Sequence, residues 1–328
     1  MKHPFLALGF AVTATMAAAE TPVLTVLTYD SITSEWGPGP AWETAFEAEC
    51  NCDLRFVGAG DGAALVARLK LEGARSEASL VLGLDTNLTS AARESGLFAP
   101  HGRPSQSDLP VPFEDPLFRP FDWSWLAFVY DKAILPEPPD SFEALAASDL
   151  KIVIQDPRSS TPGLSLLMWV KAAYGPRAEE IWAALSDNIL TITPSWSEAY
   201  GMFTAGEVDM ALSYTTSPAY HLIAEKDDSK AAAIFAEGHY MQVELVGKLA
   251  AAPQPELADQ FLAFMETEAF QSVIPLTNWM YPAHLSGKGL PEGYETLARP
   301  EKSLLFSSEE AATIRDEALA EWQAALSR

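Results

Sequence analysis

Short apolar segments alternate with amphipathic helical segments over most of this chain, and this alternation limits its possible folds more than any other feature. The apolar segments are rich in Val, Leu and Ile, as in strands buried on both faces. The helical segments space apolar residues three and four apart, and several end at a glycine suited to a helix C-terminus. The pattern predicts an α/β fold in which helices cover mainly parallel sheets. The predicted strands are 23–29, 53–58, 79–84, 151–156 and 208–214, and the predicted helices are 40–49, 62–73, 86–96, 163–175 and 195–206.

Two stretches interrupt the alternation. Residues 101–120 are rich in proline and lack periodicity, and a long aromatic strand-like segment, 121–132, follows them. A second long apolar segment occupies 239–253. Since 328 residues allow two lobes of ordinary domain size, we expect the chain to cross between lobes at these two places. The first expected lobe comprises 20–121 and 241–278, and the second comprises 122–240 and 279–328. Within the second lobe, a capping box at Ser307 and Glu310 predicts the start of a C-terminal helix.

The first residues have the features of a secretory signal peptide, residues 1–19. Lys2 precedes an apolar stretch, and Ala17 and Ala19 form an A-x-A cleavage site. No later stretch approaches the roughly 20 apolar residues of a membrane-spanning helix. We therefore expect an exported chain.

The chain is strongly acidic, with 45 Asp and Glu against 21 Lys and Arg, and a formal net charge of −24. A nucleic-acid partner is not expected, because phosphate binding needs a basic surface. The negative field attracts cations. The same charge is equally expected of a well-solvated acidic exported protein.

The two cysteines, Cys50 and Cys52, are separated by one residue. An oxidising compartment favours a disulfide between them, whereas strain in so small a ring favours the reduced form. No neighbouring His or Cys completes a metal site.

Three predicted strand-to-helix corners carry glycine or hydroxyl groups that suit a polar ligand. Residues 58–63 fit the glycine pattern of dinucleotide sites weakly, and Asp61 there either caps the next helix or faces a cation. In residues 155–163, Ser160 and Thr161 precede a helix, where they either cradle a phosphate or cap the helix itself. The third corner, 212–221, has the same plan. Its polar and aromatic members are Tyr214, Thr215, Thr216, Ser217 and Tyr220.

Aromatic residues gather at predicted strand ends and loops. Flat aromatic faces suit a planar ligand, above all one that carries a positive charge. Asp30, at the end of the first strand, and Asp61 either pair with such a cation or cap turns. The aromatic candidates are Tyr29, Trp36, Trp196, Tyr214, Tyr220, Trp279 and Tyr281.

Motifs of common enzymes are missing from the sequence. It has no G-x-S-x-G nucleophile elbow, no H-E-x-x-H and no P-loop, and its five histidines show no metal-ligand spacing. A hydrolase that uses paired carboxylates remains open, because acids are abundant.

Several motifs, in their order and spacing, resemble the periplasmic thiamine-binding proteins of bacterial ABC importers. The motifs are WGPGPAW at 36–42, ECNC at 49–52, DPRSSTPG at 156–163, SYTTSPAYH at 213–221 and NWMYP at 278–282. The resemblance covers nearly the whole chain after the signal peptide. It implies a two-lobed, type II periplasmic binding protein whose lobes are joined by hinge strands.

The resemblance also implies a ligand and its contacts. The ligand would be thiamine, thiamine monophosphate or thiamine diphosphate. The protein would be a periplasmic monomer that delivers this ligand to a membrane permease, and it would need no cofactor, metal or catalysis. Asp61, Gly62, Ser160 and Thr161 would hold the phosphate or hydroxyethyl end. The other ligand contacts that the resemblance implies are Trp196, Tyr214, Thr215, Thr216, Ser217, Tyr220 and Trp279. From their residue types and positions near the first strand, we also expect ligand contacts from Tyr29, Asp30, Ser31 and Trp36.

Two alternatives remain open from the sequence. One is an exported enzyme that acts on thiamine phosphates. The other is the same scaffold adapted to another small solute, such as iron, which would need clustered anionic oxygen ligands or tyrosinates.

Overall fold

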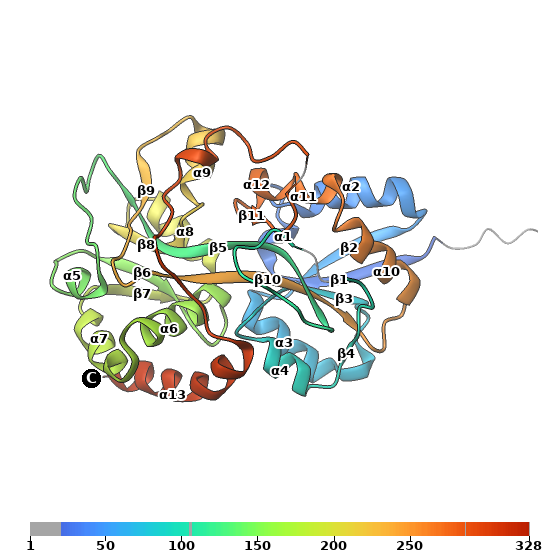
Figure 1. Cartoon of the computed structure of the whole chain (residues 1–328), viewed down its shortest axis with the longest axis horizontal. Helices are drawn as coiled ribbons and strands as arrows, with labels where there is room; N and C mark the ends of the chain where they lie inside the picture. The colour runs from blue at the N-terminus through green and yellow to red at the C-terminus, as the bar shows by residue number, and fades with distance from the viewer. Residues whose placement is uncertain (1–20, 105–106, 286, 328) are drawn as a thin grey trace, which may run out of the picture.

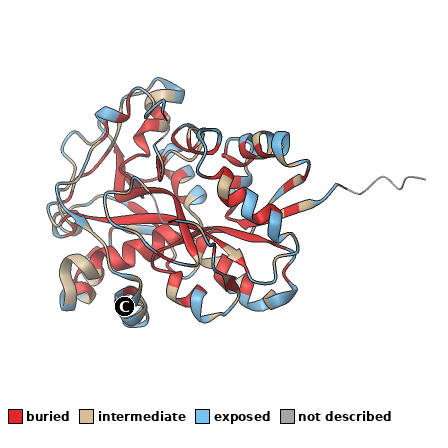
Figure 2. Ribbon diagram, turned by 45° about the vertical axis from the view of Figure 1, so that its right-hand side comes forward, coloured by how far each residue is buried: buried red, intermediate tan, exposed pale blue. Residues whose placement is uncertain are grey.

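Two long antiparallel strands, β5 (Phe118–Asp131) and β10 (His239–Leu249), run through the middle of the molecule and connect its two lobes (Figure 1). The computed structural model describes residues 21–104, 107–285 and 287–327, so the predicted signal peptide, residues 1–19, lies outside the described residues. Both strands are buried over nearly their whole length (Figure 2). They coincide with the two long strand-like segments that the sequence predicts, and their apolar and aromatic composition explains their burial.

The first lobe is built on the parallel strands β1 (Val23–Thr28), β2 (Asp53–Gly58) and β3 (Leu80–Asp85). The strand order is β2-β1-β3-β10, and β10 runs antiparallel to β3. Its helices and short strand are α1 (Asp30–Thr33), α2 (Gly39–Cys50), α3 (Gly62–Glu72), α4 (Thr89–Glu94), α10 (Pro255–Phe264), α11 (Glu268–Gln271), α12 (Ile274–Thr277) and β4 (Phe98–Ala99).

The second lobe repeats this plan with the parallel strands β6 (Ile152–Gln155), β7 (Ile189–Thr193) and β8 (Met210–Tyr214). The strand order is β5-β8-β6-β7, and β8 runs antiparallel to β5. The accompanying elements are α5 (Phe142–Ala146), α6 (Thr161–Tyr174), α7 (Ala178–Leu185), α8 (Trp196–Thr204), α9 (Pro218–Tyr220), the π-helical turn η3 (His221–Glu225), β9 (Lys230–Ala232) and α13 (Ser308–Leu326).

The long strands change partners where they pass from one lobe to the other. β5 pairs with β10 as far as Trp125 and with β8 from Leu126 onward. β10 pairs with β3 over residues 244–248, while its first residues pair with β12 (Ser303–Leu304). The sheet is therefore continuous through both lobes, and the lobe boundaries at 121/122 and 240/241 stay a prediction.

Each lobe has its own aromatic core. In the first, the rings of Trp42 and Phe270 stack with centroids 4.0 Å apart, and the Trp42 indole donates a hydrogen bond to the Phe270 carbonyl. In the second, Trp169 packs edge-on against Phe142 at 4.8 Å and donates to the Gly238 carbonyl. Both buried indole N–H groups thus have an acceptor, as burial requires.

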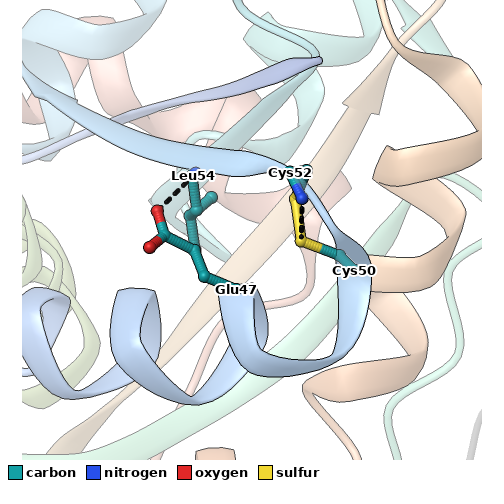
Figure 3. The surroundings of a disulfide bond; sticks show 4 residues. All are labelled: Glu47, Cys50, Cys52 and Leu54. Atoms are coloured by element: carbon teal, nitrogen blue, oxygen red, sulfur yellow. Dashed lines mark hydrogen bonds between the residues drawn. A yellow bond between two sulfur atoms is a disulfide. The ribbon is translucent and has the colours of Figure 1, made fainter. Parts of the chain in front are cut away.

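Cys50 and Cys52 form a disulfide at the junction of α2 and β2 (Figure 3). The intervening Asn51 has φ 51°, a left-handed conformation that asparagine tolerates better than most residues. Beside it, the Glu47 carboxylate accepts a hydrogen bond from the Leu54 amide at 2.9 Å. The disulfide and this bond together fix how α2 turns into β2.

The C-terminal helix α13 begins with the predicted capping box, in which Ser307 and Glu310 each accept from the other's backbone N–H. It packs on α6 and α7 of the second lobe and also contacts α4 of the first. Lys171 of α6 anchors it through ion pairs with Glu317 and Glu321. None of the described helices, α13 included, combines the length and apolar character that crossing a membrane requires.

The close approach of α6 to the end of β6 at Gly163 can be tested by substitution. A Cβ at Gly163 would lie 2.5 Å from the Gln155 carbonyl oxygen, so Gly163→Ala should destabilise the protein by about 1–3 kcal/mol through overpacking. Gly201, inside α8, has open space around it, and Gly201→Ala should stabilise by up to about 1 kcal/mol through helix propensity. Urea denaturation of both variants measures the difference. Equal midpoints would contradict the close approach.

Candidate functional site

A cavity of about 700 Å³ lies between the two lobes at the carboxyl ends of their parallel strands. This is where open α/β sheets bind ligands. Residues of the strand-to-helix connections after β1, β2, β6, β7 and β8 all contribute to its wall. The lining residues are Tyr29, Asp30, Ser31, Trp36, Gly60, Asp61, Thr161, Pro162, Ser195, Trp196, Ser197, Glu198, Tyr200, Gly201, Thr204, Tyr214, Ser217, Tyr220, Ala224, Glu244, Leu276, Thr277, Asn278, Trp279 and Met280.

Aromatic and acidic side chains make up a large part of this lining. Among the described lining residues there is no Lys, Arg or His. The acids are Asp30, Asp61, Glu198 and Glu244, and the aromatic residues are Tyr29, Trp36, Trp196, Tyr200, Tyr214, Tyr220 and Trp279. Acids and aromatic faces without a competing protein cation favour a planar, positively charged ligand.

Asp61 lies where three helices begin. Its carboxylate accepts from its neighbour's amide at 2.7 Å, from the Ser160 hydroxyl at 2.7 Å and from the Trp196 backbone N–H at 3.3 Å. The Thr161 hydroxyl is a longer fourth donor at 3.4 Å. Burial raises the pKa of Asp61, and these hydrogen bonds oppose that rise. The two hydroxyls at the start of α6 therefore contact a carboxylate of the protein, and the Ser160 side chain does not cap its own helix.

The two lobes touch beside this carboxylate. A Cβ at Gly62 would lie 2.3 Å from the Thr161 methyl carbon and 2.6 Å from the Gly83 carbonyl oxygen. Only glycine allows α3 of the first lobe to meet α6 of the second at this distance. The glycine-rich corner that the sequence singles out thus has a steric role at the lobe contact.

The predicted site residues divide into those that line the cavity and those that lie behind its wall. Gly62 and Ser160 contact Asp61 and do not line the cavity themselves. The hydroxyls of Thr215 and Thr216 lie 3.4 and 3.0 Å from that of Ser124 on β5 and are fully buried. The predicted residues that line the cavity are Tyr29, Asp30, Ser31, Trp36, Asp61, Thr161, Trp196, Tyr214, Ser217, Tyr220 and Trp279.

Tyr220 and Trp279 come from segments far apart in the chain and meet at the cavity wall. Their rings contact edge-on, with centroids 5.4 Å apart and planes at 71°. Trp279 has φ 56°, a left-handed conformation that is costly for so bulky a residue. Backbone strain of this kind clusters at ligand-binding sites. Tyr281, the remaining aromatic candidate, packs against Trp123 at 4.8 Å and does not line the cavity.

Trp196 and Tyr200 form a second aromatic surface, on α8. Their rings stack with centroids 4.9 Å apart and planes at 18°. The Trp196 indole donates to the Ser213 hydroxyl at 2.8 Å, which fixes the orientation of its ring. Trp36, by contrast, is 53% exposed, which suits a residue at the edge of a binding site.

Sequence reasoning missed the polar group at the cavity floor. Glu244 of β10 is 5% exposed and accepts from the Tyr29 hydroxyl at 2.6 Å and from the Gln242 amide at 3.0 Å. Asn278 donates to Asp122 of β5 at 2.6 Å. The sequence did contain a signal for Glu244, because an acid inside a mostly apolar strand is rarely buried without a function or a partner.

Burial changes the ionisation of these floor residues. Burial, with the nearby charges of Asp61 and Asp85, raises the pKa of Glu244 to about 7. Burial and the adjacent Glu244 raise the pKa of Asp122 well above its ordinary value. Burial also raises the pKa of the Tyr214 phenol, so it keeps its proton at neutral pH.

One group of described residues, His221, Glu225 and Asp227, has metal-ligand atoms within 4.8 Å of one another. Both ring nitrogens of His221 already have partners, since Nε2 lies 2.9 Å from the Tyr200 hydroxyl and Nδ1 lies 2.7 Å from Glu225. Asp227 accepts from Lys230. The group is a hydrogen-bonded cluster beside the cavity.

Comparisons with known proteins agree with this architecture. The chain is 50% identical to the thiamine-binding periplasmic protein of Salmonella typhimurium over 310 residues, 94% of each chain. It matches a solved periplasmic thiamin binding protein with a TM-score of 0.92 and 48% identity, over 96% of this chain and 100% of that one.

A more distant structure shares only the fold. Iron-bound HitA from Pseudomonas aeruginosa is 19% identical, with a TM-score of 0.75 over 93% of this chain and 99% of that one. The family model for bacterial extracellular solute-binding proteins matches residues 33–272. With its two α/β lobes and interlobe cavity, the chain belongs to the family of bacterial extracellular solute-binding proteins.

Proposed function

We propose that this protein captures thiamine, and its mono- and diphosphate esters, in the periplasm and delivers them to the membrane permease of an ABC importer. It acts by binding and release, without catalysis. The names of its relatives support this function, and so does its membership of a solute-binding family. We further propose that residues 1–19 direct export and that the protein acts as a monomer, since one chain encloses the cavity.

The composition of the cavity lining is the observation that carries this proposal. Thiamine joins a planar aminopyrimidine to a thiazolium ring with a permanent positive charge. Seven aromatic residues and four acids line the cavity, with no basic side chain among the described lining residues. Aromatic faces stabilise both rings by stacking and cation–π contact, and the acids neutralise the charge.

The esters of thiamine need a place for their phosphate. The donors at the start of α6 and α8 suit it, because helix N-termini with free N–H groups and hydroxyls stabilise anions. In the structure these donors bind Asp61. An ester phosphate therefore has to share or replace the contacts of this carboxylate.

The two alternative functions fit less well. A ferric site would use tyrosinates and clustered anionic oxygens, but the Tyr29 hydroxyl donates to Glu244 and the Tyr214 hydroxyl accepts from Gln242, so both phenols already have partners within the protein. An enzyme acting on thiamine phosphates needs an activated nucleophile, and the described lining offers no histidine, cysteine or lysine.

Incubation of the purified protein with thiamine monophosphate separates binding from hydrolysis, since only an enzyme releases inorganic phosphate.

Removing either ring of the Tyr220–Trp279 pair should weaken thiamine binding. Tyr220→Ala and Trp279→Ala should each reduce the binding free energy by about 1–3 kcal/mol through lost stacking and cation–π contact. Calorimetric titration with thiamine measures this change. Tyr174→Ala is the control, because Tyr174 ends α6 outside the cavity lining. Unchanged affinity in both cavity variants would contradict the proposed site.

The phosphate role of Ser160 is tested by comparing two ligands. Ser160→Ala should weaken binding of thiamine monophosphate by about 1–3 kcal/mol, the worth of a hydrogen bond to a charged group, and thiamine binding by less. The control is Ser159→Ala, because the Ser159 hydroxyl donates to the Pro194 carbonyl instead. Equal losses for both ligands in Ser160→Ala would show that Ser160 only holds Asp61 in place.

A further inference from the structure

Three buried acids lie side by side across the middle of the sheet. In the register of the strands, Glu244 of β10 lies opposite Asp85 of β3 on one side and opposite Asp122 of β5 on the other. Asp85 and Asp122 are fully buried, and Glu244 is nearly so. Among the described residues, no Lys, Arg or His forms an ion pair with any of the three.

The hydrogen-bond donors of these acids are all neutral. Glu244 accepts from Tyr29 and Gln242, and Asp122 accepts from Asn278 through Oδ2. The other carboxyl oxygen of Asp122, Oδ1, is buried and has no hydrogen-bond partner among the described residues. The carboxyl groups of Asp122 and Glu244 lie within hydrogen-bond reach of each other, so a proton held between them satisfies a buried oxygen that has no other donor.

Only Glu244 of the three reaches the cavity. The register of β10 shifts between Glu244 and Leu245 against β5, and between Leu245 and Val246 against β3. Such a bulge changes the direction of the neighbouring side chains, and bulges often occur next to binding sites. Asp85 instead has its own partners, accepting from the backbone amides of Asn87 and Leu88.

We propose that Glu244 is the residue that selects a positively charged ring in this cavity, and that it shares one proton with Asp122 that is released when the cation binds. This inference rests on the proposed function, because it identifies which group recognises the charge of thiamine. Two adjacent buried carboxyl groups cannot both be ionised without a counter-charge, so the empty site keeps a proton. A bound cation supplies that counter-charge.

The surroundings of Glu244 determine when this proton leaves. The titratable groups that face it are Tyr29 after β1, Asp61 after β2, Asp85 of β3, Asp122 of β5 and Tyr214 of β8, and none of them is cationic. Burial, together with the charges of Asp61 and Asp85, raises the pKa of Glu244 to about 7, although the hydrogen bonds from Tyr29 and Gln242 oppose that rise. Burial and the neighbouring Glu244 also raise the pKa of Asp122. A cationic ligand favours the carboxylate and lowers the pKa of Glu244. Binding below pH 7 therefore releases a proton.

The first test counts protons during binding to the purified wild-type protein. Calorimetric titrations with thiamine in two buffers of different ionisation enthalpy give the number of protons released. We expect nearly one proton at pH 6 and nearly none at pH 8, with affinity rising up to about tenfold per pH unit below pH 7. The neutral isostere 3-deazathiamine, in which a thiophene replaces the thiazolium, should release none. Equal proton counts for the two ligands would overturn the inference.

The second test removes the carboxylate. Glu244→Gln should bind thiamine at least about tenfold more weakly at pH 8 while keeping its affinity for 3-deazathiamine, because the amide keeps the size but not the charge. Glu256→Gln removes a negative charge from the exposed first turn of α10, and it is therefore the control for the effect of the protein's net charge on binding. A variant that keeps the wild-type preference for thiamine overturns the inference. If the wild type binds neither ligand at pH 8, the proposed function itself fails.

A third test needs no ligand. Since the pKa of Glu244 lies near 7 in the native state and near 4.3 in an unfolded chain, the native state keeps a proton that the unfolded chain has lost. The stabilisation from that proton falls as pH rises through this window and is constant above it. The Tm of Glu244→Gln minus that of the wild type should therefore increase from pH 5 to pH 7 and then level off. A difference that does not change with pH would contradict the buried proton.

Discussion

The antiparallel pairing of β5 with β10 is the constraint on which the rest of the structure depends. Each strand serves both lobes, so two parallel sheets that would otherwise be separate domains become one continuous sheet. The pairing turns the carboxyl ends of the parallel strands in both lobes toward one gap. Every strand-to-helix corner that carries a functional side chain then opens onto the same cavity.

Two acids that line the cavity have electrostatically different surroundings. Asp61 accepts from two hydroxyls and two backbone N–H groups, so its charge is stabilised by the donors of three helix starts. Glu244 has neutral side-chain donors and another acid next to it, so its charge is poorly stabilised. The surroundings of Asp61 thus offer many hydrogen-bond donors, whereas those of Glu244 carry excess negative charge.

Sequence patterns predicted much of the fold because local chemistry determines it. The strands β1, β2 and β8 lie within the predicted segments, and the capping box at Ser307 is confirmed. The three corners were recognised because hydroxyls and glycines ahead of a helix are typical both of helix caps and of polar ligand sites. The meeting of Gly62 with Thr161 could not be predicted, because the two residues are far apart in the sequence and meet only through the packing of the two lobes.

Glu244 and Asp122 escaped sequence reasoning for a related reason. Each lies inside a long, mostly apolar strand, and only the strand register shows that the two are opposite each other. The same holds for Thr215 and Thr216, whose position after β8 suggested ligand contacts. Their hydroxyls instead lie beside Ser124 of β5, because the tight turn into α9 directs them to the hinge. Register and turn direction are tertiary properties, which a hydroxyl-rich motif does not specify.

The contacts of Asp61 also affect how the lobes close. Asp61 and Gly62 belong to the first lobe, whereas Ser160, Thr161 and Trp196 belong to the second. Opening the lobes would remove these three donors from the carboxylate, so the contact favours a closed arrangement even before a ligand binds. A ligand then has to supply only the remaining free-energy difference between open and closed states. Under the proposed function, an ester phosphate that shares the donors of Asp61 gives up part of this contact, whereas unphosphorylated thiamine leaves it intact.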